Sequence, residues 1–208
     1  MSRSAGPLPD GAEYHSIVPP AIAVTDHDAL IIVDVQNDFL PGGKLGVAEG
    51  DRVHAPLNAL MERFFHVYAT RDWHPRDHSS FKAAGGPWPP HCVQDTMGAA
   101  FSPKLRIATI EAVISKGVDP TTEGYSGFDG TDLEQRLRDA DVTRVFVGGL
   151  ATDYCVRATA LDARRRGFNV FVVTDAIAAV KVKPDDERKA LEEMRAAGCV
   201  LVDSAQIQ

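Results

Sequence analysis

The sequence has few cysteines, no long apolar run and no excess of positive charge. Its three cysteines, Cys92, Cys155 and Cys199, are a sparse and odd set for a secreted protein that depends on disulfides. No apolar run approaches the roughly 20 residues that a membrane-spanning helix needs, and residues 1–16 contain no apolar stretch typical of a secretion signal. We therefore expect free thiols in a cytoplasmic protein.

Acidic residues outnumber basic residues by 29 to 22, so the formal net charge is −7. This charge repels phosphate backbones and anionic lipid surfaces, which argues against nucleic-acid and membrane partners. Hydrophobic residues make up 44% of the 208 residues and charged residues 25%, as in ordinary globular proteins. A chain of this length and composition is expected to form a single domain.

The first 25 residues are rich in proline, glycine and serine, and their prolines exclude long helices or strands. We expect an N-terminal arm over residues 1–25 and a folded domain over residues 26–208.

In this domain, short β-branched runs alternate with segments of helical periodicity. Strands are predicted at residues 29–35, 66–70, 112–115, 144–147, 169–174 and 200–202. Helices are predicted at 53–64, 156–166 and 187–197. A further helix is predicted to start at a capping box formed by Thr131 and Glu134. The alternation predicts a three-layer α/β fold with a mostly parallel six-stranded sheet.

Polar residues follow four successive predicted strands. Asp34 lies at the end of the first strand, Asp72 and His74 follow the second, Lys116 follows the third, and Cys155 opens the helix after the fourth. Ligands bind beyond the carboxyl ends of the strands in open α/β sheets. We therefore expect these side chains to meet at one edge of the sheet.

Cys155 is the strongest candidate for a nucleophile, because a helix N-terminus favours a thiolate. The alternative is a buried, inert thiol, and this is our interpretation of Cys199. Cys92 stays ambiguous because it adjoins His91 in a loop.

Asp34 interrupts an apolar strand, so its carboxylate needs a partner, which Lys116 would supply. Alone, the two residues would form a structural ion pair. With Cys155 at the same edge they become a base, a cation and a nucleophile, in which Asp34 accepts the thiol proton and Lys116 holds the carboxylate ionised.

Asp72 and His74 are two residues apart in predicted extended chain, so their side chains leave the same face and can share one ion. His91 supplies a third ligand from the end of a long irregular segment, residues 73–102, which we interpret as a functional loop. This set suits Zn²⁺, Fe²⁺ or Mn²⁺, while ordinary surface histidines are the alternative. Asp77 and His78 lie nearby.

Four aromatic residues fall in predicted loops after strand ends, where they either stack on a flat ring or simply pack the loops. They are Phe39, Trp73, Trp88 and Tyr125.

These residues belong to motifs of a known family. DVQNDFLPGG, RDWHP, WPPHCV, the lysine before YSGF and GLATDYCV resemble the nicotinamidases, also called pyrazinamidases, of the isochorismatase-like cysteine hydrolase superfamily. The resemblance extends from about residue 28 to residue 202 and is dense enough to be highly specific.

The resemblance implies a Rossmann-like, six-stranded parallel sheet of order 3-2-1-4-5-6, and it assigns roles to residues. The implied catalytic triad is Asp34, Lys116 and Cys155, the implied ligands of one divalent metal ion are Asp72, His74 and His91, and the implied substrate-binding residues are Phe39, Leu45, Trp88 and Tyr125. His78 occupies a position where some relatives have a further ligand.

The resemblance also implies a cis peptide bond between Leu150 and Ala151. Its expected purpose is to direct the N–H of Ala151, together with that of Cys155, toward the developing oxyanion.

The implied reaction is hydrolysis of nicotinamide to nicotinate and ammonia in NAD salvage, with pyrazinamide as a second substrate. Isochorismatase-type enzymes do not need the cysteine or the metal, and amidases of carbamoyl or maleamate substrates generally lack the metal ligands, so the present set favours a pyridine-type ring. Three alternatives stay open: another small amide as the substrate, a non-catalytic nicotinamide-binding module, and a purely structural metal. The resemblance also leaves a homo-oligomer open.

Overall fold

The computed structural model describes residues 21–208, so residues 1–20 of the predicted N-terminal arm lie outside the described residues. The last residues of that predicted arm run beside the C-terminal end, where Ile22 N–H donates to Gln206 O and Val24 N–H donates to Gln208 O. None of the helices in this part of the chain is long and apolar enough to cross a bilayer.

Six parallel strands form one sheet in the order β3-β2-β1-β4-β5-β6, as the resemblance implies. The strands are β1 (Asp28–Val33), β2 (His66–Asp72), β3 (Ala112–Lys116), β4 (Arg144–Leu150), β5 (Asn169–Ala178) and β6 (Val200–Val202). The predicted α/β class and the parallel sheet are therefore confirmed.

The central strand of the sheet is buried on both faces, and this explains why its sequence is apolar. All six residues of β1 are buried, and the strand pairs with β2 on one side and β4 on the other. A strand covered on both faces is apolar throughout rather than alternating. Gly149 in β4 passes so close to β1 that a Cβ would lie 2.0 Å from Val33 O, so this position needs glycine.

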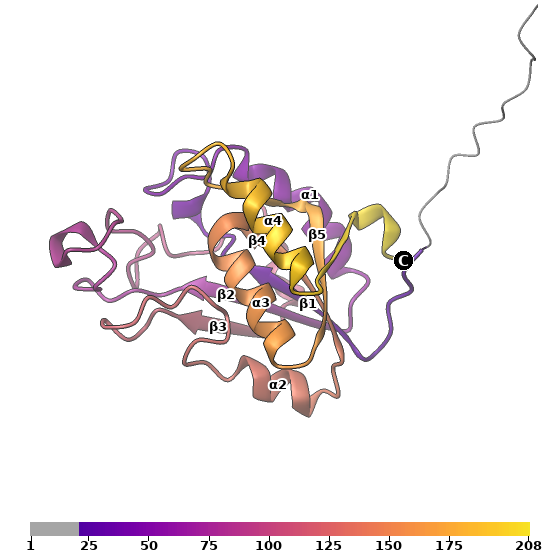
Figure 1. The fold of residues 1–208 in the computed structure, drawn as a ribbon. Coiled ribbons are helices and arrows are strands. Elements are labelled where there is room, and N and C mark those ends of the chain that lie inside the picture. Colours follow the sequence, from indigo (N-terminus) through magenta and orange to yellow (C-terminus); the bar gives the residue numbers. More distant parts are fainter. Residues whose placement is uncertain (1–20) are drawn as a thin grey trace, which may run out of the picture.

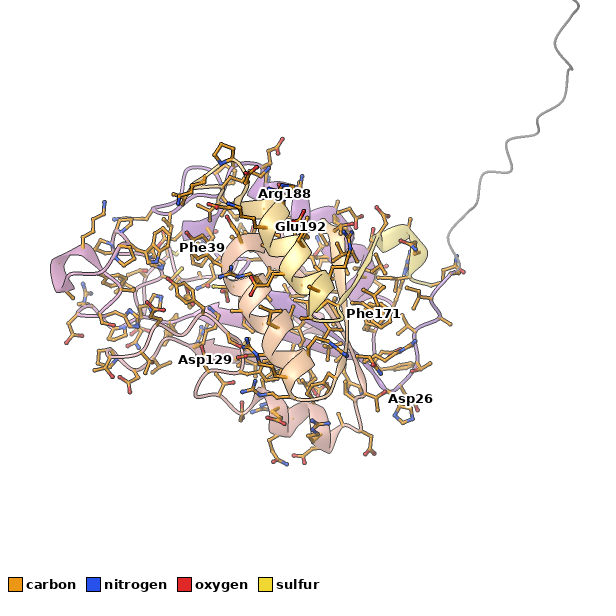
Figure 2. All side chains as sticks on the ribbon, viewed as in Figure 1. Asp26, Phe39, Asp129, Phe171, Arg188 and Glu192 are labelled. Carbon is orange, nitrogen blue, oxygen red and sulfur yellow. The ribbon has the colours of Figure 1, made fainter. Side chains whose placement is uncertain are left out.

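Helices cover the two faces of the sheet (Figure 1). Helix α1 (His54–Met61) packs with one hydrophobic cluster, which includes Leu30 and Ile32 of β1. Helices α2 (Leu133–Asp139) and α3 (Arg157–Arg165) contribute to the opposite cluster with Ile31 and Val33, and α4 (Asp186–Ala196) adds Met194 there. The outer side of α4 is polar, and Arg188 Nη1 donates to Glu192 at 2.9 Å (Figure 2).

The predicted capping box at Thr131 and Glu134 is wrong. Helix α2 begins at Leu133, two residues after Thr131, and its N-cap Asp132 accepts no side-chain cap hydrogen bond. The Thr131 hydroxyl accepts only from Leu133 N, at 3.4 Å, and it donates to Gly127 O at 2.6 Å in the preceding turn. The predicted helix at 53–64 is likewise shorter, because α1 ends at Met61.

The predicted loop 73–102 contains one short 3₁₀ turn, Lys82–Ala84, and isolated bridges. With residues 117–130, it lies beyond the carboxyl ends of β2 and β3, on the side toward which their arrowheads point (Figure 1). Phe39 lies on the same side of the molecule (Figure 2). The carboxyl edge of the sheet is thus the edge that the loops enclose.

Candidate active site

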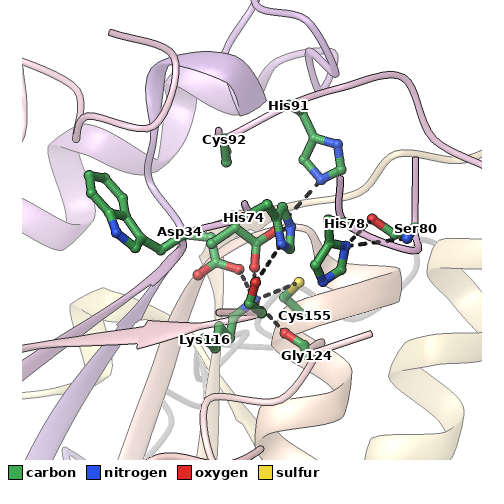
Figure 3. A network of polar contacts seen from close by, with 12 residues as sticks. Asp34, His74, His78, Ser80, His91, Cys92, Lys116, Gly124 and Cys155 are labelled. Carbon is green, nitrogen blue, oxygen red and sulfur yellow. Dashed lines mark hydrogen bonds and ion pairs between the residues drawn. The ribbon is translucent and has the colours of Figure 1, made fainter. Parts of the chain in front are cut away.

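Four elements bring the three predicted catalytic residues and the predicted metal ligand Asp72 together at this edge (Figure 3). Asp72 and Lys116 are the last residues of β2 and β3 and are direct partners in the register of the two strands. Asp34 directly follows β1, and Cys155 lies in a π-helical turn, Thr152–Val156, between β4 and α3. The predicted first strand ends two residues early, because Asp34 adopts a φ of 50°.

Lys116 is the centre of this arrangement. Its Nζ lies 2.7 Å from Asp34 Oδ2 and 2.5 Å from Asp72 Oδ1. The ammonium group also donates to Gly124 O at 3.1 Å and to Cys155 Sγ at 3.3 Å. A fully buried cation therefore occupies the space between two carboxylates and a thiol, where its charge offsets theirs.

The two carboxylate oxygens of Asp34 have different neighbours. Oδ1 accepts from the Thr70 hydroxyl at 2.6 Å, whereas Oδ2 faces the Lys116 ammonium group at 2.7 Å. Lys116 also donates to Asp72, Gly124 and Cys155. A carboxylate oxygen offers more than one lone pair, so Oδ2 can accept a proton as a general base must.

Burial controls the protonation of the candidate nucleophile. It raises the pKa of the Cys155 thiol well above its ordinary value, although Lys116 acts in the opposite direction. Burial therefore opposes the thiolate that the helix start favours. This direction favours a protonated thiol, for which Asp34 is the expected proton acceptor.

The pKa of Asp34 is raised by burial, with Lys116 opposing that shift, so the lysine only partly fulfils its predicted role of keeping the carboxylate ionised. Burial by itself lowers the pKa of Lys116, but Asp34 and Asp72 together raise it well above its ordinary value. The lysine thus stays charged beside a carboxyl that readily takes a proton.

Asp72, His74 and His91 form a second group beside Lys116. All three residues are buried, and their ligand atoms lie within 4.8 Å of one another. Asp72 Oδ2 lies 3.3 Å from His74 Nε2 and 3.8 Å from His91 Nε2. The structure therefore brings together the three predicted ligands.

In both His74 and His91, backbone carbonyls contact Nδ1 and leave Nε2 free to bind a metal. His74 Nδ1 contacts Gly117 O at 3.0 Å, and His91 Nδ1 contacts Pro89 O at 2.8 Å. Because a carbonyl only accepts, each Nδ1 is the protonated nitrogen and each Nε2 presents a lone pair to the centre. Burial lowers the pKa of His91, which favours the neutral form that binds metals. These residues fit a divalent cation.

Gly117 makes the His74 contact possible, since a Cβ there would lie 2.4 Å from His74 Cε1. Gln36 is a residue that the sequence reasoning missed: its side chain donates to Asp72 O at 2.7 Å and accepts from Asp72 N at 2.8 Å. The glutamine of DVQNDF was the available signal.

Other residues near the motifs take different places. The His78 ring lies 4.1 Å from that of His74, but His78 offers no atom to the ligand cluster. Its Nδ1 contacts Ser80 Oγ at 2.8 Å, and its Nε2 has no hydrogen-bond partner among residues 21–208. Asp77 is exposed, and Cys199 is buried in the hydrophobic cluster around α3, as predicted for an inert thiol.

A narrow cavity joins the thiol to the candidate metal ligands. The four predicted substrate-binding residues, Phe39, Leu45, Trp88 and Tyr125, all line it, together with Ala151 and Cys155. The peptide bond between Leu150 and Ala151 is cis, as the resemblance implies. Trp88 Nε1 donates to the Tyr125 hydroxyl at 3.0 Å, which braces one wall.

Four further residues line the cavity without having been predicted, namely Ser80, Glu123, Tyr154 and Val180. Tyr154 precedes Cys155, so its position was a usable signal. Val180 follows β5 and belongs to none of the motifs. Trp73, in contrast, does not line the cavity, and its ring packs under the Arg71 guanidinium at 3.7 Å.

Comparisons with known proteins agree with this geometry. The isochorismatase domain family matches residues 28–206. The nicotinamidase of Escherichia coli is 40% identical over 83% of this chain and 93% of its own length, and the nicotinamidase/pyrazinamidase of Mycobacterium tuberculosis is 45% identical over 85% and 99%.

Two solved structures extend the likeness to three dimensions. PnC1 of L. infantum, in complex with nicotinate, superposes with a TM-score of 0.86 at 41% identity and covers 90% of this chain and 98% of its own. The pyrazinamidase of Pyrococcus horikoshii, in complex with zinc, gives a TM-score of 0.80 at 49% identity over 85% and 99%. The chain is thus a member of the isochorismatase family, related over most of its length to nicotinamidases.

Proposed function

We propose that this protein hydrolyses nicotinamide to nicotinate and ammonia, and pyrazinamide in the same way, with residues 26–208 as the catalytic domain. One observation carries the proposal: a buried thiol with the Asp34 carboxylate within 4.8 Å shares a cavity with three metal-ligand side chains. Names of relatives at 40% and 45% identity support the same substrate.

Asp34 starts the reaction as general base. It takes the proton of the Cys155 thiol, and the thiolate attacks the carboxamide carbon. The C–N bond then breaks, Asp34 returns the proton to the leaving nitrogen, and ammonia departs from a thioester. Water, deprotonated by Asp34, cleaves the thioester and restores the thiol.

Lys116 and two backbone N–H groups stabilise charge during these steps. The ammonium group, 3.3 Å from Sγ, offsets the negative charge that develops on sulfur. We assign the oxyanion to the N–H groups of Ala151 and Cys155, because both residues line the cavity at the turn that carries the thiol.

Asp72, His74 and His91 would hold one divalent cation, for which Zn²⁺, Fe²⁺ and Mn²⁺ are the candidates. Such an ion supplies a Lewis acid for the lone pair of the pyridine nitrogen and so fixes one end of the ring. Phe39, Trp88 and the other wall residues provide apolar contacts to the faces and edges of a flat ring.

The metal-ligand set favours a ring that carries a basic nitrogen over aliphatic amides. This reaction places the protein in NAD salvage. A cytoplasmic location and a homo-oligomer stay predictions from the sequence.

The decisive experiment measures ammonia release from nicotinamide by purified protein, before and after chelation and with single divalent metals restored. We expect activity that disappears on chelation and returns with metal. Activity that is unchanged by chelation would still support the thiol chemistry, but it would show that the metal has at most a structural role. If no metal gives ammonia, the substrate is another amide, or the protein is a nicotinamide-binding module, which equilibrium dialysis would reveal.

A further inference from the structure

A second buried carboxylate, that of Asp38, lies behind the cavity wall and takes no part in the chemistry above. Asp38 belongs to the 3₁₀ turn Asn37–Phe39 that follows β1, and only 8% of its surface is exposed. It does not line the cavity that holds Cys155. A buried carboxylate is costly unless it is fully hydrogen-bonded, so its partners are informative.

Those partners are backbone N–H groups from a distant segment and from the loop that directly follows Asp38. Asp38 Oδ2 accepts from Cys92 N at 2.8 Å, and Oδ1 accepts from Lys44 N at 3.3 Å. Among residues 21–208, no basic side chain forms an ion pair with Asp38 within 4.0 Å. The carboxylate therefore connects two stretches of main chain rather than neutralising a cation.

The first of these stretches carries the candidate metal ligands. Cys92 directly follows His91, and Cys92 O accepts a hydrogen bond from His74 N at 3.0 Å. Cys92 adopts a φ of 44°, a conformation that a non-glycine residue holds only when its surroundings fix it. The hydrogen bond from Cys92 N to Asp38 is one such fixing contact.

The second stretch carries the wall of the substrate cavity. Leu45 follows Lys44 and donates its own N–H to Asp38 O at 2.9 Å, while Phe39 follows Asp38 directly. Leu45 and Phe39 both line the cavity. The Phe39 ring in turn lies 5.5 Å from the ring of His91. Asp38 thus stands between the wall and a metal ligand.

Gly98 makes space for this carboxylate. A Cβ at Gly98 would lie 2.1 Å from Asp38 Oδ2, and Asp38 N donates to Gly98 O at 3.0 Å. No residue larger than glycine fits there without displacing the carboxylate. The position gives an independent way to move Asp38 without changing its charge.

We propose that Asp38 is a positioning residue, which holds the His91 segment and the Phe39–Leu45 wall in one geometry through Cys92 and Lys44. The part that concerns substrate rests on the proposed function, whereas the part that concerns metal binding does not. Asn is the sharpest substitution, because its amide oxygen can accept one of the two N–H groups while its NH₂ group faces the other.

The test measures the affinity of the folded, metal-free protein for Zn²⁺ alone, by competition with a chelator. We expect Asp38→Asn to bind Zn²⁺ about tenfold or more weakly, the scale seen when residues supporting metal ligands are lost. The KM for nicotinamide is expected to rise as well. Asp51→Asn is the matched control, since Asp51 lines a second, outer pocket together with Asp38 but is exposed and makes no side-chain bond to the His91 segment. Its Zn²⁺ affinity is expected to stay within about twofold of the wild-type value.

Gly98→Ala is the second variant and should weaken Zn²⁺ binding in the same way. It keeps the proposal testable if Asp38→Asn does not fold. A merely structural role would lower the free energy of unfolding and leave the affinity of the folded protein unchanged. Wild-type Zn²⁺ affinity in the folded variants would overturn the proposal, as would a wild-type protein that binds no Zn²⁺. If the wild type binds Zn²⁺ but releases no ammonia, the proposed function fails while the Zn²⁺ titration still decides the role of Asp38.

Discussion

The ammonium nitrogen of Lys116 lies 2.7 Å from Oδ2 of Asp34, and neither side chain is exposed to solvent. Lys116 also donates to Asp72, Gly124 and Cys155, and Asp34 Oδ2 keeps a lone pair that can accept a proton. This relationship resolves an apparent conflict at the site. The thiol of Cys155 has a raised pKa, but a base and a cation stand beside it.

Replacement of the nucleophile should abolish turnover and leave binding intact. We expect Cys155→Ala to lower kcat for nicotinamide by about 10⁴-fold or more, because a group that acts as a unit with its base cannot be replaced by the remaining parts. Ammonia release measures turnover, and equilibrium dialysis measures binding, which should change by only a few-fold.

Cys199→Ala is the matched control for this substitution. Cys199 is a buried free thiol in the hydrophobic cluster around α3 and lines no part of the active-site cavity. Its variant should keep nearly the wild-type kcat. Normal turnover by Cys155→Ala would exclude the thioester mechanism.

Asp34→Asn should be inactive and yet more stable than the wild type near pH 7. Burial raises the pKa of Asp34 above its ordinary value of 3.8, so the folded state favours the neutral carboxyl. The resulting stabilisation is present below pH 3.8 and is lost as pH rises through the raised pKa of the folded protein. An amide is neutral at every pH and avoids that loss.

Urea unfolding of both metal-free proteins between pH 4.5 and pH 8 would measure this effect. The free energy of unfolding of Asp34→Asn should exceed that of the wild type at pH 7, and the difference should narrow toward the acidic end. A difference that widens toward the acidic end would contradict the direction of the Asp34 shift.

His91→Ala should weaken Zn²⁺ binding by more than about 100-fold, because it removes one of three ligands rather than a supporting contact. Circular dichroism should show an unchanged fold, since His91 lies in a loop. His78→Phe is the comparison, because it keeps a ring against His74 and removes nitrogens that lie outside the ligand cluster. Equal losses of Zn²⁺ affinity in the two variants would show that His78 is also a ligand.

The bond between Trp88 and Tyr125 should contribute to substrate affinity. Trp88→Phe and Tyr125→Phe each remove one partner of the 3.0 Å hydrogen bond. A neutral hydrogen bond contributes about 0.5–1.5 kcal/mol, so we expect KM to rise by roughly two- to tenfold in each variant. The KM of the double variant should be no higher than that of either single variant. Additive effects would show that the two residues act separately.

The sequence by itself predicted the order of the elements and the places where polar residues interrupt them. Continuous apolar runs such as β1 indicate buried parallel strands, and in parallel sheets all carboxyl ends meet at one edge. That rule was sufficient to bring Asp34, Asp72, Lys116 and Cys155 together. The resemblance then added the strand order and the cis bond at Leu150, which no periodicity reveals.

Only the tertiary structure decided how these groups work. Burial, which depends on every surrounding segment, raised the pKa of both Cys155 and Asp34. The contacts of Lys116 with Asp34 and Asp72, the cavity position of Val180 and the bond of Asp38 to the backbone N–H of Cys92 likewise follow from packing between remote parts of the chain. Local sequence patterns encode neighbours along the chain, whereas desolvation and hydrogen-bond geometry are set by neighbours in space.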